Sequence, residues 1–264
     1  MAFFHLSSFL EITIMRKTVT ALALAASAAV PSIASAQLSG NMGIVSDYRF
    51  RGISQTYTQP AIQGGIDYAH SSGFYIGNWN SSVSGVSFAG GGGIEMDLYG
   101  GFKKGFGDLT LDVGLLQYYY PNAKALGTEK YDTLEAYVGL SWKFLSAKYS
   151  QTLTDWFGVN SISTATTNGN SEGSGYLELN ASYELKPKLT LVGHLGQQTV
   201  KNYKNFDYTD YKIGLTYDLN GWVLGAAYID TDADDPFYTA VADGAGKVKD
   251  IGKGTVVLSI GKTF

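Results

Sequence analysis

The chain has 264 residues, of which 45% are hydrophobic and 16% are charged, and its formal net charge is -4. The 33 Gly and 19 Tyr favour β-structure with tight turns, whereas the low charge content and only 5 Pro exclude a disordered chain. A mean hydropathy of -0.03 excludes a bundle of membrane helices. The acidic balance argues against nucleic acid as a partner, and the lack of Cys excludes disulfides, thiolate metal sites and cysteine nucleophiles.

The first predicted element is a cleaved signal peptide within residues 1–36, with Met15 as the true initiator. Its apolar run is about 12 residues, well short of the ~20 that a membrane-spanning helix needs. The parts of the signal are the basic residues Arg16 and Lys17, the apolar residues 19–30, and the small-residue cleavage site Ala34–Ala36. We therefore predict that residues 37–264 form the mature protein as a single domain.

After residue 37 the hydrophobicity alternates with a period of two. Ile94, Met96 and Leu98 alternate with Glu95 and Asp97, for example, so the charges fall on one face of a strand. No later stretch is apolar over the ~18 residues of a membrane helix, so only strands can cross a membrane. The pattern predicts twelve strands, over residues 42–52, 60–69, 73–82, 94–103, 108–119, 131–143, 145–155, 175–186, 189–200, 208–219, 221–230 and 254–264.

The predicted connections alternate between short and long. His70–Gly73 and Asn220–Gly221 are short, whereas residues 157–174 and 231–253 are long. A soluble β-sandwich also has alternating strands, but nothing in its architecture requires this asymmetry of the loops. Short periplasmic turns and long outer loops are typical of membrane barrels. We therefore predict an all-β, transmembrane, up-and-down antiparallel barrel of about twelve strands with both termini in the periplasm.

The last predicted strand ends on an aromatic residue of its apolar face, Phe264. This ending resembles the signal that the barrel-assembly machinery reads in bacterial outer-membrane barrels. Lys262 departs from that pattern, although its long side chain can reach the rim of the membrane. Aromatic residues near strand ends predict girdles at the two membrane interfaces. They include Tyr48, Phe50, Tyr68, Phe74, Phe102, Trp142, Trp156, Tyr217 and Trp222.

Two blocks near the start of the predicted barrel carry a family resemblance. They are Ser46–Gln55, with the sequence SDYRFRGISQ, and Pro60–Tyr68, with the sequence PAIQGGIDY. Both resemble the opening of the proteobacterial TorF family of porins, and Gly73–Gly77 and Tyr118–Pro121 are similar in kind. The resemblance implies a pore in the outer membrane of a Gram-negative bacterium. It implies no particular solute and no site residues.

If the apolar faces meet lipid, the opposite faces line a lumen, and their ionisable residues are the candidate pore lining. Arg49 and Arg51, two residues apart on the first predicted strand, can contact an anionic solute or form ion pairs with neighbouring carboxylates. The competing hypothesis is a cation-favouring stripe of Asp67, Glu95, Asp97 and Asp112, and the excess of lumenal acids agrees with it. The candidates are Asp47, Arg49, Arg51, Asp67, Glu95, Asp97, Asp112, Glu135, Lys148, Glu178, Glu184, His194 and Lys212.

Together these features predict a porin-like channel that passes small hydrophilic solutes or ions, with no enzymatic activity, cofactor or metal. The structural alternative is a non-conducting barrel, closed by ion pairs, that serves as an anchor or adhesion surface. A lipid hydrolase is the enzymatic alternative, but alternation turns His194 toward the lumen rather than the lipid. The acidic segment Asp230–Asp235 lacks the Gly and the distal Glu of a calcium loop.

Overall fold

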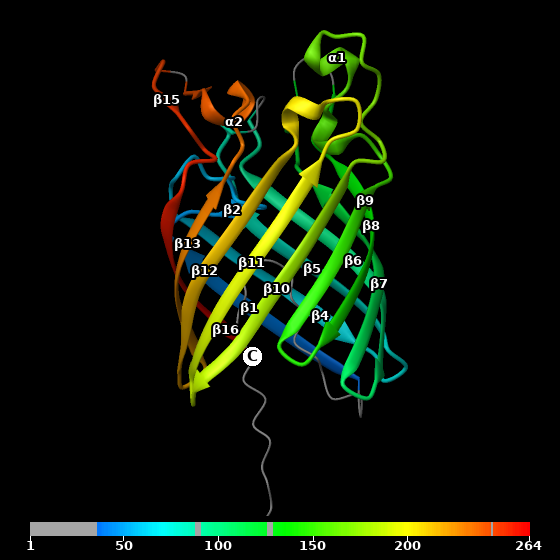
Figure 1. Ribbon diagram of the computed structural model, residues 1–264, viewed down its shortest axis with the longest axis vertical. Coiled ribbons are helices and arrows are strands. Elements are labelled where there is room, and N and C mark those ends of the chain that lie inside the picture. Colours follow the sequence, from blue (N-terminus) through cyan, green and yellow to red (C-terminus); the bar gives the residue numbers. More distant parts are fainter. Residues whose placement is uncertain (1–35, 88–90, 126–128, 244) are drawn as a thin grey trace, which may run out of the picture.

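Twelve long strands close into a barrel in the computed structural model, which describes residues 36–87, 91–125, 129–243 and 245–264 (Figure 1). Each strand is antiparallel to both neighbours, and β1 closes the barrel by pairing with β16 and β4. In order around the wall, the strands are β1 (Gln37–Val45), β16 (Thr255–Thr263), β13 (Trp222–Thr231), β12 (Tyr208–Leu219), β11 (Leu189–Thr199), β10 (Gly175–Lys186), β9 (Leu145–Thr152), β8 (Thr133–Trp142), β7 (Leu109–Tyr119), β6 (Ile94–Phe106), β5 (Phe74–Ser82) and β4 (Ala61–Ala69). The predicted fold class is confirmed.

The outward face of the wall is apolar and the inward face is polar, as the alternation predicts. On β12, Ile213 and Leu215 are 60% and 43% exposed, whereas Asp210 and Thr216 on the other face are buried. Successive side chains of a strand point to opposite sides, so these buried polar residues line the interior of the barrel.

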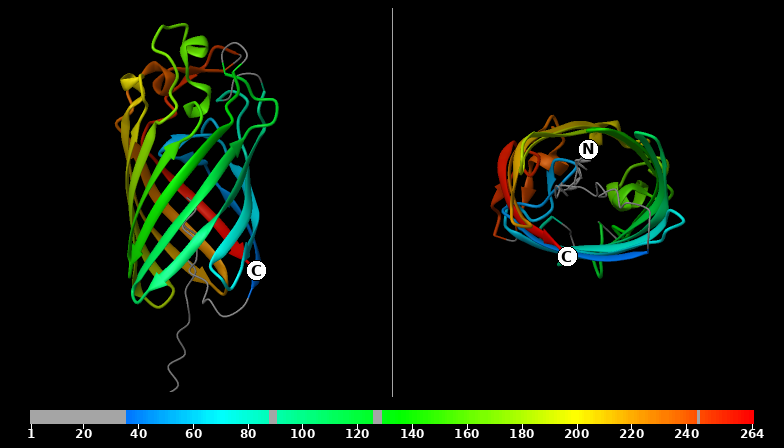
Figure 2. Two further views of the ribbon diagram at one scale, coloured as in Figure 1. Left: turned by 90° about the vertical axis from the view of Figure 1, so that its right-hand side faces the viewer. Right: turned by 90° about the horizontal axis from the view of Figure 1, so that it is seen from below.

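The two ends of the barrel differ in their connections (Figure 2). Tight turns join the strands at one end, called the turn end. Asn220 and Gly221 join β12 to β13 there with φ angles of 55° and 89°, the left-handed pair that a type I′ turn requires. Gln37 lies opposite Ala69, and Phe264 bonds to Gly40, so both ends of the barrel chain lie at the turn end. The assignment of the turn end to the periplasm stays a prediction.

Longer connections form the opposite end, called the loop end, and they carry the remaining short elements (Figure 1). These are β2 (Arg49–Phe50) and β3 (Ile53–Ser54) in residues 46–60, η1 (Trp156–Gly158) and α1 (Ser161–Thr164) in residues 153–174, η2 (Lys204–Phe206) in residues 200–207, and α2 (Pro236–Thr239), β14 (Val241–Ala242) and β15 (Val248–Lys249) in residues 232–254. Within the described ranges, none of the helices has the length and apolar character needed to cross a membrane.

The first strand is the element that the sequence analysis places wrongly. The predicted strand 42–52 corresponds to β1, which ends at Val45, and residues 46–60 then leave the wall. The other eleven predicted ranges overlap the observed wall strands. The predicted signal peptide, with its start at Met15, lies outside the described residues except for Ala36.

The assignment of faces makes a prediction at Ile213, halfway along β12. An Arg on the lipid-facing side costs about 2–4 kcal/mol near the middle of a bilayer. We expect Ile213→Arg to lower the free energy of unfolding in lipid vesicles by that amount, measured by urea titration with tryptophan fluorescence. Lys212→Arg keeps a positive charge on the inward face and should change this free energy by less than about 0.5 kcal/mol. Equal losses in the two variants would contradict the assignment.

Candidate functional site in the barrel lumen

The lumen is filled at the loop end. At this end, every wall strand has a buried side chain on its inward face. A water-filled opening would leave such side chains exposed, so their burial shows that other residues fill the space. The closed ring, as we call these residues, consists of Val45, Ala61, Ser81, Glu95, Tyr118, Thr133, Thr152, Tyr176, Gln198, Tyr208, Ile229 and Val257. The material that covers them comes from the long loops.

Residues 46–60, called the first loop, fold into this space (the blue segment inside the barrel in Figure 2). Phe50 packs against Tyr118 of β7 and against Phe157 of η1, with ring centroids 5.3 and 5.6 Å apart. Tyr48 packs edge-on against Trp79 of β5, with centroids 5.5 Å apart. The first loop therefore contacts both the wall and the loop between β9 and β10.

Arg51 extends from the first loop to the far wall. Its Nη2 donates to both carboxylate oxygens of Glu135 on β8, at 2.9 and 2.8 Å, and its Nη1 donates to Gln198 Oε1 on β11 at 2.8 Å. The guanidinium carbon also lies 4.1 Å from the ring centroid of Tyr176 and 4.8 Å from that of Phe50. Burial lowers the pKa of Arg51, but the Glu135 carboxylate outweighs it and raises the pKa overall, so the group stays charged.

Arg49 ties the first loop to a different segment. Its Nε donates to Asp47 Oδ2 at 2.6 Å, and both side chains are almost fully buried. Its Nη1 donates to three main-chain carbonyls, those of Gly52, Ile251 and Lys253. The prediction that Arg49 and Arg51 lie on the first strand, whose predicted range 42–52 also includes Asp47, is therefore wrong. All three belong to the first loop, whose backbone turns away from the wall after Val45.

Two aromatic-rich clusters fill the rest of the loop end. One gathers Tyr48, Tyr118 and Tyr120 with apolar wall residues, and Phe50, Trp79 and Phe157 pack against it. The other combines the first loop with the remaining long loops through Ile53, Tyr57, Trp156, Val159, Val200, Tyr203, Phe206, Tyr208, Tyr238 and Ile251. Aromatic side chains bury large areas, so these clusters give the closed end most of its cohesion.

Three of the predicted girdle residues lie in these clusters instead of facing lipid. Tyr48 and Trp156 are buried, and Phe50 is half-buried. Each belongs to a loop that folds inward, so the alternation of the neighbouring strand does not apply to it. Trp142 and Trp222, at 49% and 38% exposed, do lie on the outward face near the turn end.

Glu95 and Asp97 of β6 are buried carboxylates with no basic partner among the described residues. Tyr48 donates to Glu95 Oε1 at 2.8 Å. Burial, reinforced by the Glu95 charge, holds the pKa of Tyr48 well above its usual range, so the hydroxyl keeps its proton. Glu95 Oε2 and Asp97 Oδ1 have no hydrogen-bond partner in the described part of the chain. The two arginines thus pair with Asp47 and Glu135, not with these acids.

The turn-end half of the lumen is more open, and its charges pair between neighbouring strands. Lys103 lies 3.4 Å from Asp112, and Lys148 lies 2.8 Å from Glu178. The side chains of Lys103, Asp112 and Lys148 are 15%, 25% and 28% exposed, in contrast with the closed ring. Tyrosine hydroxyls complete the network, with Tyr99 donating to Asp67, Tyr75 donating to Asp112, and Tyr137 contacting Tyr75.

His194 lies on the lumenal face of β11. Its Nε2 lies 2.9 Å from Asp210 Oδ1 and 3.0 Å from the Tyr176 hydroxyl, and its Nδ1 lies 2.7 Å from Asn180 Oδ1. Both ring nitrogens are therefore occupied by wall residues. Its hydrogen-bond partners in the described ranges include no Ser or Thr hydroxyl of the kind that a nucleophile–base pair requires.

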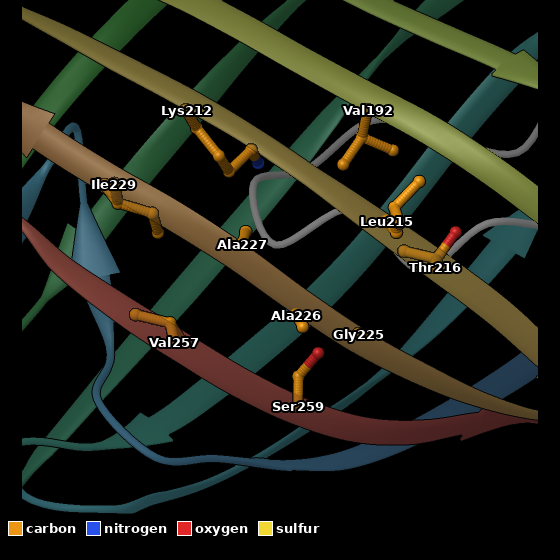
Figure 3. A pocket seen from close by; sticks show the side chains of 10 residues that line it. All are labelled: Val192, Lys212, Leu215, Thr216, Gly225, Ala226, Ala227, Ile229, Val257 and Ser259. Carbon is orange, nitrogen blue, oxygen red and sulfur yellow. The ribbon is translucent and has the colours of Figure 1, made fainter.

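Lys212 differs from the other lumenal bases because no carboxylate of the described chain forms an ion pair with it. It borders a small cavity of about 30 Å³, whose apolar side includes Val192, Ile229 and Val257 (Figure 3). Such a space holds only one or two water molecules. Glu184, the remaining candidate, is exposed near the turn end. No group of three or more His, Asp and Glu side chains is placed to hold a metal ion in the described ranges.

The sequence analysis missed the neutral members of the site. Gln198 and Tyr176, which contact Arg51, lie on inward positions of β11 and β10. Applying the alternation of inward and outward positions to uncharged residues as well would have found them. Phe157 and Trp156 belong to a loop with no periodic pattern. Nothing local in the sequence indicates that they fold inward.

A closed twelve-stranded barrel with an apolar exterior and a charged interior shares its fold with two solved porins. The NanC porin is 13% identical, with a TM-score of 0.52, and the match covers 86% of this chain and 99% of that chain. The KdgM porin in complex with disordered oligogalacturonate is 8% identical, with a TM-score of 0.50, and the match covers 86% of this chain and 97% of that chain. The protein therefore has the porin type of β-barrel.

The chain belongs to the Gcw_chp family, which is described as a bacterial protein of unknown function and whose model matches residues 28–264. No curated protein matches the sequence. The resemblance to the TorF family stays a prediction, because the family shown is Gcw_chp.

The first loop depends on Gly52, whose φ of +82° is left-handed. A Cβ there would collide with the Thr231 methyl and the Asp210 side chain, whereas Gly107, at φ +63°, has no atom within 4 Å of such a Cβ. We expect Gly52→Ala to lower the free energy of unfolding by roughly 2 kcal/mol or more, against about 1 kcal/mol for the control Gly107→Ala. Urea titration measures both values.

The same pair of variants can be compared by limited trypsin digestion. Gly52→Ala should accelerate cleavage after Arg49 and Arg51, because the displaced loop loses its contacts, and Gly107→Ala should not. Equal cleavage rates would contradict the close packing of Gly52 against the wall.

Proposed function

We propose that the protein is a porin-like channel in the outer membrane of a Gram-negative bacterium, through which small hydrophilic solutes or ions diffuse passively. The observation that carries the proposal is a lumen lined with paired charges inside a wall whose outer face is apolar. Lipid requires the apolar outer face, and a hydrated pathway explains why so many charges face inward. The fold shared with solved porins supports the proposed location.

The charge balance of the lumen favours cations and neutral solutes. Four basic side chains are matched one to one by carboxylates, in the pairs Arg49–Asp47, Arg51–Glu135, Lys103–Asp112 and Lys148–Glu178. Apart from Glu184, Lys186 and Asp218 at the turn-end rim, the described wall strands present the further lumenal carboxyl groups Asp67, Glu95, Asp97 and Asp210, against the base Lys212 and the histidine His194. An excess of fixed negative charge raises the local concentration of cations and repels anions.

The KdgM porin was solved in complex with disordered oligogalacturonate, which is an acidic sugar chain. A lumen with surplus carboxylates disfavours a solute of that charge, so we do not extend this ligand to the present protein. Small cations and uncharged hydrophilic molecules fit the charge balance better.

A non-conducting barrel that serves as an anchor or adhesion surface is the second candidate. The observation in its favour is the closed ring, which all twelve wall strands join with a buried inward side chain. The two candidates differ in whether the loop end ever opens. Electrical recording from the purified protein in a planar bilayer separates them, since absence of any current above the lipid background would exclude the channel.

The channel hypothesis predicts a reversal potential of cation-selective sign in asymmetric salt. We expect Asp67→Asn to lower the cation-to-anion permeability ratio by about twofold, because it removes an unmatched charge from the more open half of the lumen. The control Asp234→Asn removes an exposed carboxylate of α2's loop, where salt screens it, and should leave the ratio unchanged. A wild-type preference for anions would contradict the charge argument.

A further inference from the structure

We infer that the first loop, residues 46–60, is a gate that closes the loop end of the lumen, and that the contact between Arg51 and Glu135 is its latch. The inference rests on the proposed channel function and specifies how that channel is regulated. In the closed position the loop covers wall residues that otherwise would face the lumen.

The first loop is attached to the wall in a way that allows it to leave. Its strands β2 and β3 pair only with each other, so no ladder of the barrel depends on them. The main chain of Ser46, where the loop leaves the wall, bonds to Leu258 of β16, that of Ser54 bonds to Ile251, and that of Gln55 bonds to Ser84. The other hydrogen bonds from the loop to the rest of the described chain involve at least one side chain. Release of the loop therefore breaks no hydrogen bond between wall strands, and local opening of this kind costs less than unfolding the barrel.

The backbone of the loop is held under strain by those contacts. Arg51, Tyr57 and Thr58 have φ angles of 46°, 54° and 60°, a region that costs a residue with a side chain roughly 1 kcal/mol or more. Such a conformation persists only while surrounding contacts impose it. Removal of one strong contact should therefore shift the loop toward release.

Arg51 makes the strongest of the contacts to the far wall. Its positive charge is buried, and Glu135 is the only carboxylate that pairs with it among the described residues. Removing one partner of a buried pair is strongly destabilising, because the other charge is left without compensation. Arg49, by contrast, pairs within the loop itself and so does not bridge the lumen.

The test compares Glu135→Gln with Glu178→Gln by single-channel recording in planar bilayers. Both wild-type glutamates form lumenal ion pairs at 2.8 Å, but Glu178 pairs with Lys148 in the wall and does not contact the first loop. We expect Glu135→Gln to raise the fraction of time that the channel is open on the order of tenfold. Glu178→Gln should change the conductance of the open channel, because Glu178 lines the lumen, but should leave the open fraction near the wild-type value, because Glu178 does not contact the first loop. Heat-modifiable migration on gels verifies that each variant is folded.

A disulfide lock provides the second readout. The wild-type chain contains no Cys, so the pair Gln55→Cys/Ser84→Cys, at positions joined by a main-chain bond of 2.9 Å, introduces the only thiols. Added to Glu135→Gln, the oxidised pair should return the open fraction to the wild-type value, and reduction should restore the increase. Each single Cys variant is the control and should show no response to oxidant.

The outcomes separate the gate from the channel. If the wild type conducts but Glu135→Gln does not change the open fraction, the gate is overturned and the channel hypothesis stands. The same conclusion follows if the oxidised disulfide does not lower the open fraction of Glu135→Gln. Equal increases in Glu135→Gln and Glu178→Gln would also overturn the latch. No current in any variant that migrates as folded barrel would overturn the channel, and the gate with it.

Discussion

Closure of the barrel between β1 and β16 is the constraint on which the rest of the structure depends. It leaves no unpaired strand edge in the barrel wall, and it fixes every second side chain of the wall strands inside a cylinder. In a barrel of eight strands, side chains alone fill that space, but twelve strands enclose a wider lumen. Loops therefore have to supply whatever closes it. Long connections exist only at the loop end, so one end is filled while the other stays more open.

Most of the wall could be predicted from the sequence, because each strand is determined by the pattern of its own residues. A strand between lipid and a polar lumen must alternate, and the predicted range 208–219 coincides with β12 for that reason. Turn chemistry is equally local, since Asn220–Gly221 adopts the left-handed pair that its sequence favours. Once the strands are known, their alternation decides which residues face the lumen. The inward positions of residues such as Glu95, Glu178 and His194 could therefore also be predicted from the sequence.

The inward folding of the loops could not be predicted, because it depends on contacts with residues that are distant in sequence. The segment Asp47–Arg51 alternates polar and aromatic residues like a strand, and this pattern predicts a continuation of the first strand. In the structure all these side chains lie inside the lumen. Tyr48 and Phe50 contact the wall residues Glu95 and Tyr118, whereas Asp47 and Arg49 pair with each other. The partner of Arg51 is 84 residues away in sequence, and only the closed barrel brings it within reach. The one local cue was Gly52, whose left-handed φ breaks a strand.

The chemistry of the contact between the first loop and the far wall supports a reversible role for it. If the loop served only to fill the barrel permanently, apolar side chains would do so at lower cost, because a buried ion pair rarely repays the desolvation of both its charges. The two aromatic-rich clusters, to which the first loop itself contributes Tyr48, Phe50, Ile53 and Tyr57, show that the chain also uses such packing there. Charged partners have a different advantage. Arg51 and Glu135 both regain hydration when they separate, whereas separated aromatic surfaces expose apolar area to water. A contact that forms and breaks, as the proposed gate requires, is therefore better made with charges, and this contact lies where the loop meets the wall across the lumen.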